Sequence, residues 1–233
     1  RVAKGKAMSQ LDEIADLSFP IALPPTLLEV HQRFDAPKVA DIAAATARAL
    51  EESGLLASLR PGASVALGVG SRGIANLPAV VKAAVARLRV AGMQPYVVPA
   101  MGSHGGATAA GQLGVLADLG VTEESVGAEI RATMEVAEIG RLPDGTALCQ
   151  GLDSHAADHT ILISRIKPHT DFRSHLESGP SKMSVIGLGK QAGAAMMHAG
   201  GGAKFHRYQA PAARIYVANT NLAGANCLVE NAY

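Results

Sequence analysis

The sequence has few cysteines and almost no net charge. Its 233 residues include two cysteines, Cys149 and Cys227, which are far apart and form no CxxC motif. Neither a thiolate metal site nor a disulfide framework is indicated, and this fits a reducing cytoplasm. The formal net charge is +1, from 21 basic and 20 acidic residues, without an evident basic patch. This balance argues against a nucleic-acid partner, because binding to phosphates needs a positive surface.

Long apolar runs and several familiar motifs are also missing. No run approaches the roughly 20 apolar residues of a membrane span, and the first residues lack the apolar core of a signal peptide. We therefore expect a cytoplasmic protein with no membrane partner. The sequence has a single HxxxH spacing, at His155 and His159, away from the other candidate site residues, and it has no GxSxG elbow and no internal repeat.

The composition indicates a folded domain with a substantial core. Hydrophobic residues make up 48% of the sequence and charged residues only 18%. Residues 1–7 precede Met8, and we expect them to be foreign to the natural start. We interpret 8–233 as one α/β domain. Its last residues are predicted to form a strand without a polar tail, so we expect a piece of a longer protein.

Short apolar runs alternate with helical patterns along the chain. This alternation, with glycine-rich loops between the elements, predicts a mostly parallel sheet flanked by helices, Rossmann-like in its connections. Asp35 is predicted as the N-cap of the first helix, because it precedes an alanine-rich segment that stops at Gly54. The predicted strands are 27–34, 63–70, 94–100, 128–134, 136–147, 160–166 and 227–230, and the predicted helices are 35–54, 76–92, 107–119, 179–200 and 209–219.

Chemically useful side chains follow three of the predicted strands. Arg72 follows 63–70, His104 lies in the loop GSHGG, and His169 follows 160–166. The carboxyl ends of parallel strands meet at one edge of a sheet, so we expect these loops to converge there. The arginine fork suits a carboxylate or phosphate, and an imidazole exchanges protons near neutral pH. The alternatives are a surface arginine and a turn histidine that binds backbone.

The stretch 167–200 concentrates histidines, lysines and glycines. Its segment GLGKQAG at 187–193 is one residue out of step with GxGxxG, so it is a weak dinucleotide signature. Glycines before a helix that starts with a lysine are compatible with a phosphate cradle, and equally with close helix packing. His175 and Lys190 also lie here, but no partner elsewhere in the sequence indicates a role for them.

Five short features together resemble one known family. They are GSR at 70–72, GSH at 102–104, PH at 168–169, SK at 181–182, and His198 sixteen residues after Lys182. In order and separation they resemble the nickel-dependent lactate racemase family. The resemblance covers about residues 63–200, and the family's N-terminal α/β domain is about as large as this whole chain.

The resemblance implies a specific cofactor and a set of residues that bind it. Family members carry a nickel pincer, a pyridinium-3,5-bisthiocarboxylic acid mononucleotide that is bound covalently to a lysine. By motif position that lysine is Lys182, His198 is the nickel ligand, and Gly187 and Gly189 lie toward the cofactor or its phosphate. Soft sulfur donors with one imidazole suit square-planar Ni(II).

The resemblance also implies racemisation or epimerisation of a 2-hydroxy acid, lactate-like or larger, by reversible hydride transfer to the cofactor. His104 and His169 would be the two acid–base groups, and Arg72 would bind the substrate carboxylate. The sequence departs from the family pattern at Val69 and Gly73, where the family tends to have an acidic residue and a proline. A C-terminal domain that closes the cleft in the family is expected as a partner but is absent from this chain.

Two alternatives stay open at this point. The first is a non-catalytic domain that binds a phosphorylated metabolite on the glycines of 187–193. The second is a mononuclear zinc enzyme that uses His169, His175 and His198, although their spacing lends it little support. Of these three interpretations, only the nickel enzyme implies an organic group attached to Lys182.

Overall fold

A computed structural model describes residues 26, 28–71, 73–169, 173 and 176–231. The chain divides into two units, Arg1–Asp35 and Ala36–Tyr233. In the first unit, the described residues are 26 and 28–35, and they form neither helix nor strand. The strand predicted over 27–34 is therefore wrong for the described part of that range. The second unit contains all the helices and strands given below.

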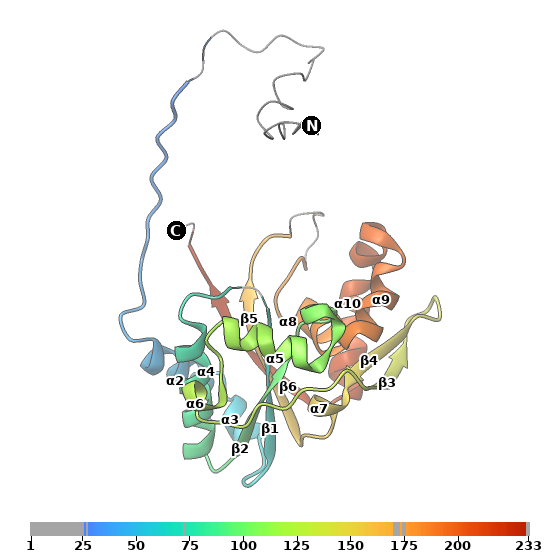
Figure 1. The fold of residues 1–233 in the computed structure, drawn as a ribbon, viewed down its shortest axis with the longest axis horizontal. Coiled ribbons are helices and arrows are strands. Elements are labelled where there is room, and N and C mark those ends of the chain that lie inside the picture. Colours follow the sequence, from blue (N-terminus) through green and yellow to red (C-terminus); the bar gives the residue numbers. More distant parts are fainter. Residues whose placement is uncertain (1–25, 27, 72, 170–172, 174–175, 232–233) are drawn as a thin grey trace, which may run out of the picture. The chain divides into compact units, whose positions relative to one another are not determined.

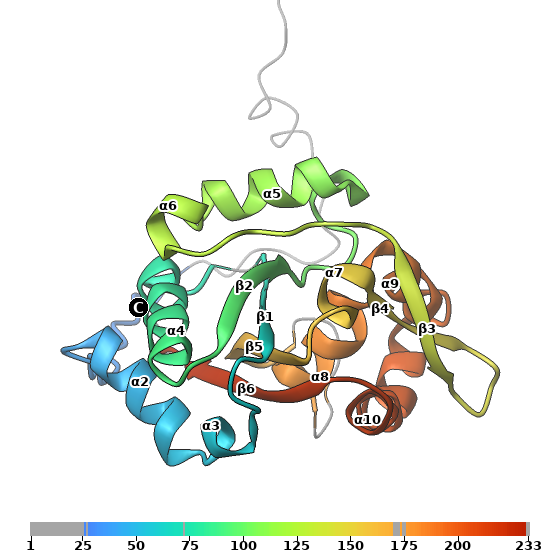
Figure 2. The same cartoon turned by 90° about the horizontal axis from the view of Figure 1, so that it is seen from below.

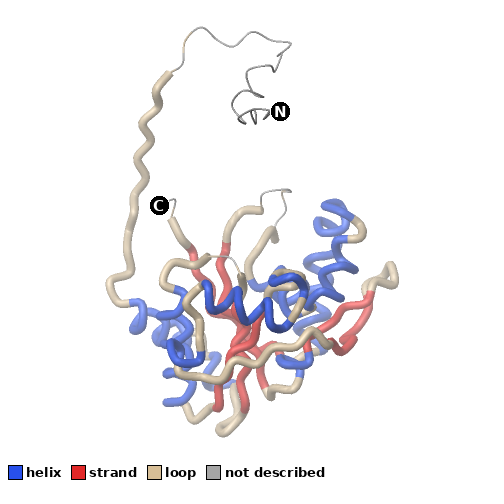
Figure 3. The backbone as a smooth tube through the Cα atoms, in the orientation of Figure 1, coloured by secondary structure: helices blue, strands red, loops and turns tan. Residues whose placement is uncertain are grey.

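The second unit is built on a four-stranded sheet in which every pairing is parallel. Its strands are coloured red, with the other strands, in Figure 3. The strand order is β2-β1-β5-β6, so the chain crosses over from β2 past β1 to reach β5. This confirms the predicted α/β class. The strands are β1 (Ser64–Val69), β2 (Gln94–Pro99), β5 (His159–Ile166) and β6 (Leu222–Val229).

One face of the sheet packs against the helices that precede and follow β1. Val65, Leu67 and Val69 of β1 point to this side, because successive side chains of a strand alternate between faces, and Leu50 and Leu88 cover them. Asp41, not Asp35, caps the first helix, since its carboxylate accepts a hydrogen bond from the Ala44 amide at 2.9 Å. The elements on this face are α2 (Ile42–Glu52), α3 (Leu55–Ser58), α4 (Leu77–Val90) and α6 (Glu123–Val126).

The opposite face packs against the C-terminal helices and a small hairpin. Ala66 of β1 and Leu162 of β5 point to this side, where Leu188 and Tyr216 are fully buried. The predicted helix 179–200 is three successive segments, and the helix predicted over 209–219 begins earlier, at Gly201. The elements here are β3 (Val136–Arg141), β4 (Ala147–Gly151), α7 (Leu152–His155), α8 (Pro180–Lys182), the π-helix η2 (Met183–Leu188), α9 (Lys190–His198) and α10 (Gly201–Asn219).

Two further elements follow β2, the 3₁₀ turn η1 (Gly105–Ala107) and helix α5 (Ala109–Asp118), and α5 packs beside this edge strand of the sheet (Figure 2). The predicted strand 128–134 is wrong, since it pairs with the sheet only through the bridge between Val97 and Ile130. No helix in the described part of the chain is long and apolar enough to cross a membrane.

The parallel strands deliver their loops to a common edge. In Figure 1 the carboxyl ends of β1, β5 and β6 lie at the top of the sheet, and α8 follows β5 on the same side. Residues 70–71 after β1, the turn η1 after β2 and residues 167–169 after β5 all lie at this edge. The predicted site residues belong to these loops and to the helices that continue them.

Candidate functional site

A cavity of about 270 Å³ lies at the carboxyl ends of β1, β2 and β5. Four of the titratable residues that the sequence predicts for a site line it, and Gly187 lines it as well. Arg72 and His175 lie outside the described residues, although Gly70 and Ser71, which precede Arg72, line the cavity. The four titratable residues are His104, His169, Lys182 and His198.

The loop that carries His104 is held by tight backbone packing. A Cβ atom on Gly111 would lie 1.8 Å from the Gly105 carbonyl oxygen, so the loop closes onto the first turn of α5 only because both residues are glycines. The Nε2 group of Gln112, which is completely buried, donates to the carbonyl oxygens of Gly102 at 2.8 Å and His104 at 3.4 Å. The backbone at His104 is thus fixed before any ligand binds.

The imidazole of His104 is oriented by a residue of the β1 loop. The Ser71 hydroxyl forms a hydrogen bond with Nδ1 of His104, with 2.5 Å between the two atoms. A hydrogen bond to one ring nitrogen selects the tautomer and leaves the other nitrogen for proton exchange. The contact with Ser71 therefore fixes the orientation of the His104 ring through Nδ1.

His169 is positioned by contacts across the base of its loop. Its amide donates to Oε2 of Glu177 at 2.8 Å, and the Lys167 amide donates to the Ser178 hydroxyl, also at 2.8 Å. These two bonds tie the exit of β5 to the residues just before α8. The His169 side chain then reaches Lys182, whose Nζ lies 2.6 Å from Nε2 of the imidazole.

Lys182 and His198 share an aromatic neighbour. Phe205 of α10 lies with its ring centroid 6.0 Å from Nζ of Lys182, and it makes an edge contact with the His198 ring at 4.8 Å between centroids. Loss of hydration lowers the pKa of His198 from its usual value, and the nearby charge of Lys182 lowers it further. The imidazole is therefore neutral at neutral pH and has a lone pair for a metal or a proton.

The π-helix η2 forms one wall of the cavity through Met183, Ile186 and Gly187. A Cβ atom on Gly187 would lie 2.6 Å from the carbonyl oxygen of Ala100, so this glycine lets η2 contact the end of β2 directly. The Gly102 amide donates to the Gly187 carbonyl at 3.1 Å. Wide π-turns occur often at functional sites, and this one begins directly after Lys182.

Gly189 and Lys190 connect η2 to α9, and both pack inside the protein. A Cβ atom on Gly189 would lie 2.4 Å from the Val185 carbonyl oxygen, which is the close-packing alternative for this glycine. Lys190 is fully buried, and its Nζ donates to Oδ2 of Asp153 at 2.7 Å and to the Pro99 carbonyl at 2.8 Å. Its amine is thus occupied inside the protein, and it does not complete a phosphate cradle at 187–193.

Lys190 has two further unusual properties, its pKa and its backbone conformation. Loss of hydration lowers the pKa of its ammonium group, and the Asp153 carboxylate opposes that effect. The residue also adopts a φ of 55°, which is uncommon for a side chain other than glycine. This partner was not evident from the sequence, because Asp153 lies 37 positions away in a segment with no recognisable motif.

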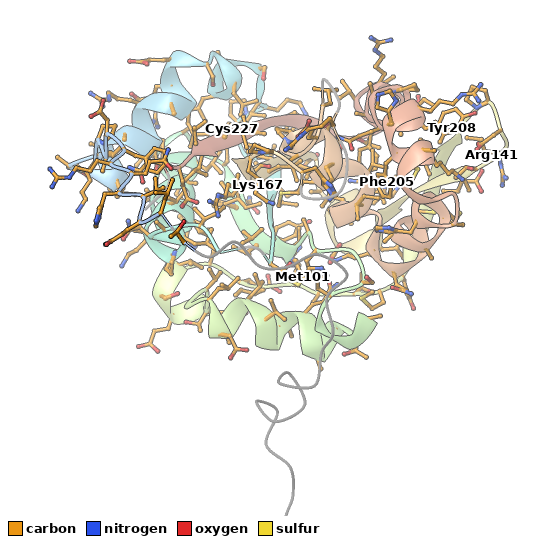
Figure 4. The ribbon with its side chains drawn as sticks, turned by 90° about the horizontal axis from the view of Figure 1, so that it is seen from above. Met101, Arg141, Lys167, Phe205, Tyr208 and Cys227 are labelled. Carbon is orange, nitrogen blue, oxygen red and sulfur yellow. The ribbon has the colours of Figure 1, made fainter. Side chains whose placement is uncertain are left out.

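Two more polar residues at the cavity escaped the sequence analysis as functional candidates. Ser71 entered the analysis only as part of GSR, and Lys167 only as the first residue of the stretch 167–200, yet both line the cavity. Figure 4 views this edge from above and labels Lys167, Met101 and Phe205 around it. Arg165 also lines the cavity, but its guanidinium binds Glu230 at 2.6 Å and the Gly73 carbonyl at 3.1 Å.

Metal ligands from the protein itself are sparse. Among the described residues, no three His, Cys, Asp or Glu side chains are grouped so that they would hold a metal ion. Of the residues in the zinc alternative, His169 and His198 line the cavity, and His175 is outside the described part.

Comparison of the chain with protein-family models and with curated proteins finds no match. Membership of the nickel-dependent lactate racemase family therefore stays a prediction. It depends on the spacing of the motifs and on the residues that the cavity brings together.

Proposed function

We propose that this chain is the cofactor-binding and catalytic domain of a racemase or epimerase that acts on a 2-hydroxy acid. One observation supports the proposal most strongly. His104, His169, Lys182 and His198 come from separate segments of the chain, and all four line a single cavity at the carboxyl edge of the sheet. Ligand sites in open α/β sheets lie at this edge.

The donor set of the cavity suits a cofactor that brings its own metal ligands. Of the three imidazoles at the cavity, His198 is the one for which a lowered pKa is found, Lys182 supplies an amine, and no three-residue metal group occurs among the described residues. Lys182 would attach the nickel-pincer mononucleotide covalently, and His198 would bind its nickel. When bound, this cofactor would accept the C2 hydride of the substrate and return it to either face.

Two histidines would accept and donate the proton of the substrate hydroxyl group. One takes the proton as the C2 hydride leaves, and the other supplies a proton when hydride returns on the opposite face. His104 would use Nε2, since Ser71 binds Nδ1. His169 would use its Nε2, which faces Lys182 in the unmodified chain. The two imidazoles come from the loops after β2 and β5.

Positive charge at the cavity would hold the substrate carboxylate. The family resemblance gives this role to Arg72, which follows the cavity residue Ser71. Lys167 lines the cavity and adds a second cation, whereas Arg165 is already engaged by Glu230. A carboxylate held by such groups keeps C2 at a fixed distance from the reacting atoms, and this positioning lowers the entropic part of the barrier.

The test is to produce the protein in a host that makes the cofactor. We expect nickel, a covalent adduct in the intact mass, and interconversion of the enantiomers of at least one 2-hydroxy acid by chiral chromatography. Lys182→Ala should remove the adduct and the activity, whereas Lys82→Ala, at an exposed lysine of α4, should keep both. An adduct that persists in Lys182→Ala would contradict the proposal.

A further inference from the structure

Lys182 and His169 form a pair that is suited to chemistry before any cofactor is bound. We infer that Lys182 of the unmodified chain is a nucleophilic amine, and that His169 is the base that takes its proton when the amine attacks an electrophilic carbonyl carbon. This assigns His169 a second role, in loading the site. It rests on the proposed function only for the identity of the natural electrophile, a carbonyl or thiocarbonyl compound of mononucleotide size.

The geometry of the pair carries the inference. Nζ of Lys182 lies 2.6 Å from Nε2 of His169, which is a hydrogen-bond distance. A hydrogen bond between two nitrogens requires one to present a lone pair to a proton on the other. At this distance a proton can pass directly from Nζ to Nε2 as the lone pair of Nζ is used, which is the arrangement that general-base assistance requires. A lysine becomes a nucleophile when such a base or a second cation lies next to it.

Both members of the pair are fixed by the fold. His169 is held through its amide by Glu177, and Lys182 ends α8 where the π-helix begins. The ring of Phe205 lies on one side of the amine, with His198 beyond it.

Acylation of Lys182 needs no reactant other than the electrophile and water. The shared proton passes fully to Nε2 of His169, which leaves a lone pair on Nζ. That lone pair forms a bond to the carbonyl carbon while the leaving group departs with the electron pair of its own bond. The second proton of the nitrogen is then lost to water, and the product is an amide of Lys182.

Acetic anhydride is the probe, because it is small and acylates amines directly, with acetate as the leaving group. Trace labelling of the apo protein at pH 7, followed by peptide mass analysis, gives the acetylation rate at each lysine. Lys82 of α4 is exposed and serves as the internal reference. General-base assistance raises rates by tenfold or more, so we expect Lys182 to react roughly ten times faster than Lys82.

His169→Gln removes the base and keeps a side chain that forms hydrogen bonds. We expect the ratio of Lys182 to Lys82 labelling to fall roughly tenfold in this variant. The matched control is His155→Gln, at an exposed histidine of α7, which should keep the wild-type ratio. A wild-type ratio of one or less overturns the inference, as does an unchanged ratio in His169→Gln. The wild-type measurement needs no variant, so it stands even where a substitution prevents folding.

The result is independent of racemase activity, because no nickel or hydroxy acid takes part. Fast acetylation of Lys182 in a chain that never gains the nickel adduct would keep the nucleophilic lysine and reject the proposed function. Slow acetylation in a chain that does gain the adduct and racemises would keep the function and reject His169 as the base for loading.

Discussion

The buried pair of Lys190 and Asp153 allows a quantitative prediction about the stability of the fold. Their side chains are 0% and 2% exposed, and Nζ lies 2.7 Å from Oδ2. Lys190→Met would leave the Asp153 carboxylate buried, with the amides of Ser154 at 2.8 Å and Thr133 at 3.3 Å as its donors among the described residues. Removing one partner of such a pair costs about 3–5 kcal/mol, because the other charge is left uncompensated.

Urea unfolding followed by circular dichroism measures this loss. With a slope of about 2 kcal/mol per molar urea, the midpoint should fall by about 2 M in Lys190→Met. The control is Arg141→Met, which breaks the exposed pair of Arg141 and Glu138 and should cost no more than about 1 kcal/mol.

A double-mutant cycle separates the charge from the packing. Asp153→Asn combined with Lys190→Met removes both charges while the amide oxygen still accepts from the backbone. The double variant should therefore be more stable than the sum of the single effects predicts, by about 2 kcal/mol. A cost of less than about 1 kcal/mol for Lys190→Met, or a coupling near zero, would refute the reasoning.

Two further predictions concern the loops that surround the cavity. Ser71→Ala should release Nδ1 of His104 and change its tautomer equilibrium, seen as a shift of the His104 ring nitrogens in ¹⁵N NMR, while Ser71→Thr should preserve the spectrum; unchanged ring shifts in Ser71→Ala would count against the orienting role. Gly187→Ala should destabilise the fold by more than about 1 kcal/mol in urea, because its Cβ would lie 2.6 Å from a backbone oxygen. Gly114→Ala, in open space on α5, should be neutral or stabilising by about 1 kcal/mol, and an equal effect at both glycines would contradict the packing argument.

The sheet was predictable because its strands follow local rules. Segments 63–70, 94–100 and 160–166 are short apolar runs bounded by glycine or proline, and each forms a buried parallel strand. The pattern of parallel strands then places the loops that follow them on one edge, and the structure brings His104 and His169 to one cavity there. This part of the site depends on topology alone.

Other features depend on distant contacts that the sequence does not reveal. Asp35 and Asp41 are equally good caps by type, and only the observed helix start decides for Asp41. Residues 128–134 have the apolar content of a strand but make a single bridge. Lys190 would ordinarily be assigned to the surface, since lysines are rarely buried, and its burial depends on a carboxylate from another element.

The glycines of 187–193 show why a single pattern has two interpretations. Open room for a ligand and close approach of two backbones both require the absence of a side chain. Gly187 lines the cavity and also touches Ala100, whereas Gly189 packs against Val185. Only coordinates distinguish these cases.

The π-helix η2 also makes the direction of Lys182 depend on a residue count. An α-helix turns by about 100° per residue, and a π-turn takes up an additional residue within the same ladder. If η2 lost one residue and became α-helical, everything before it would rotate by about 100° relative to α9. Lys182 would then leave His169 without any change in the chemistry of either side chain. In this chain the length of one helical turn, as much as the identity of its residues, specifies which amine meets which imidazole.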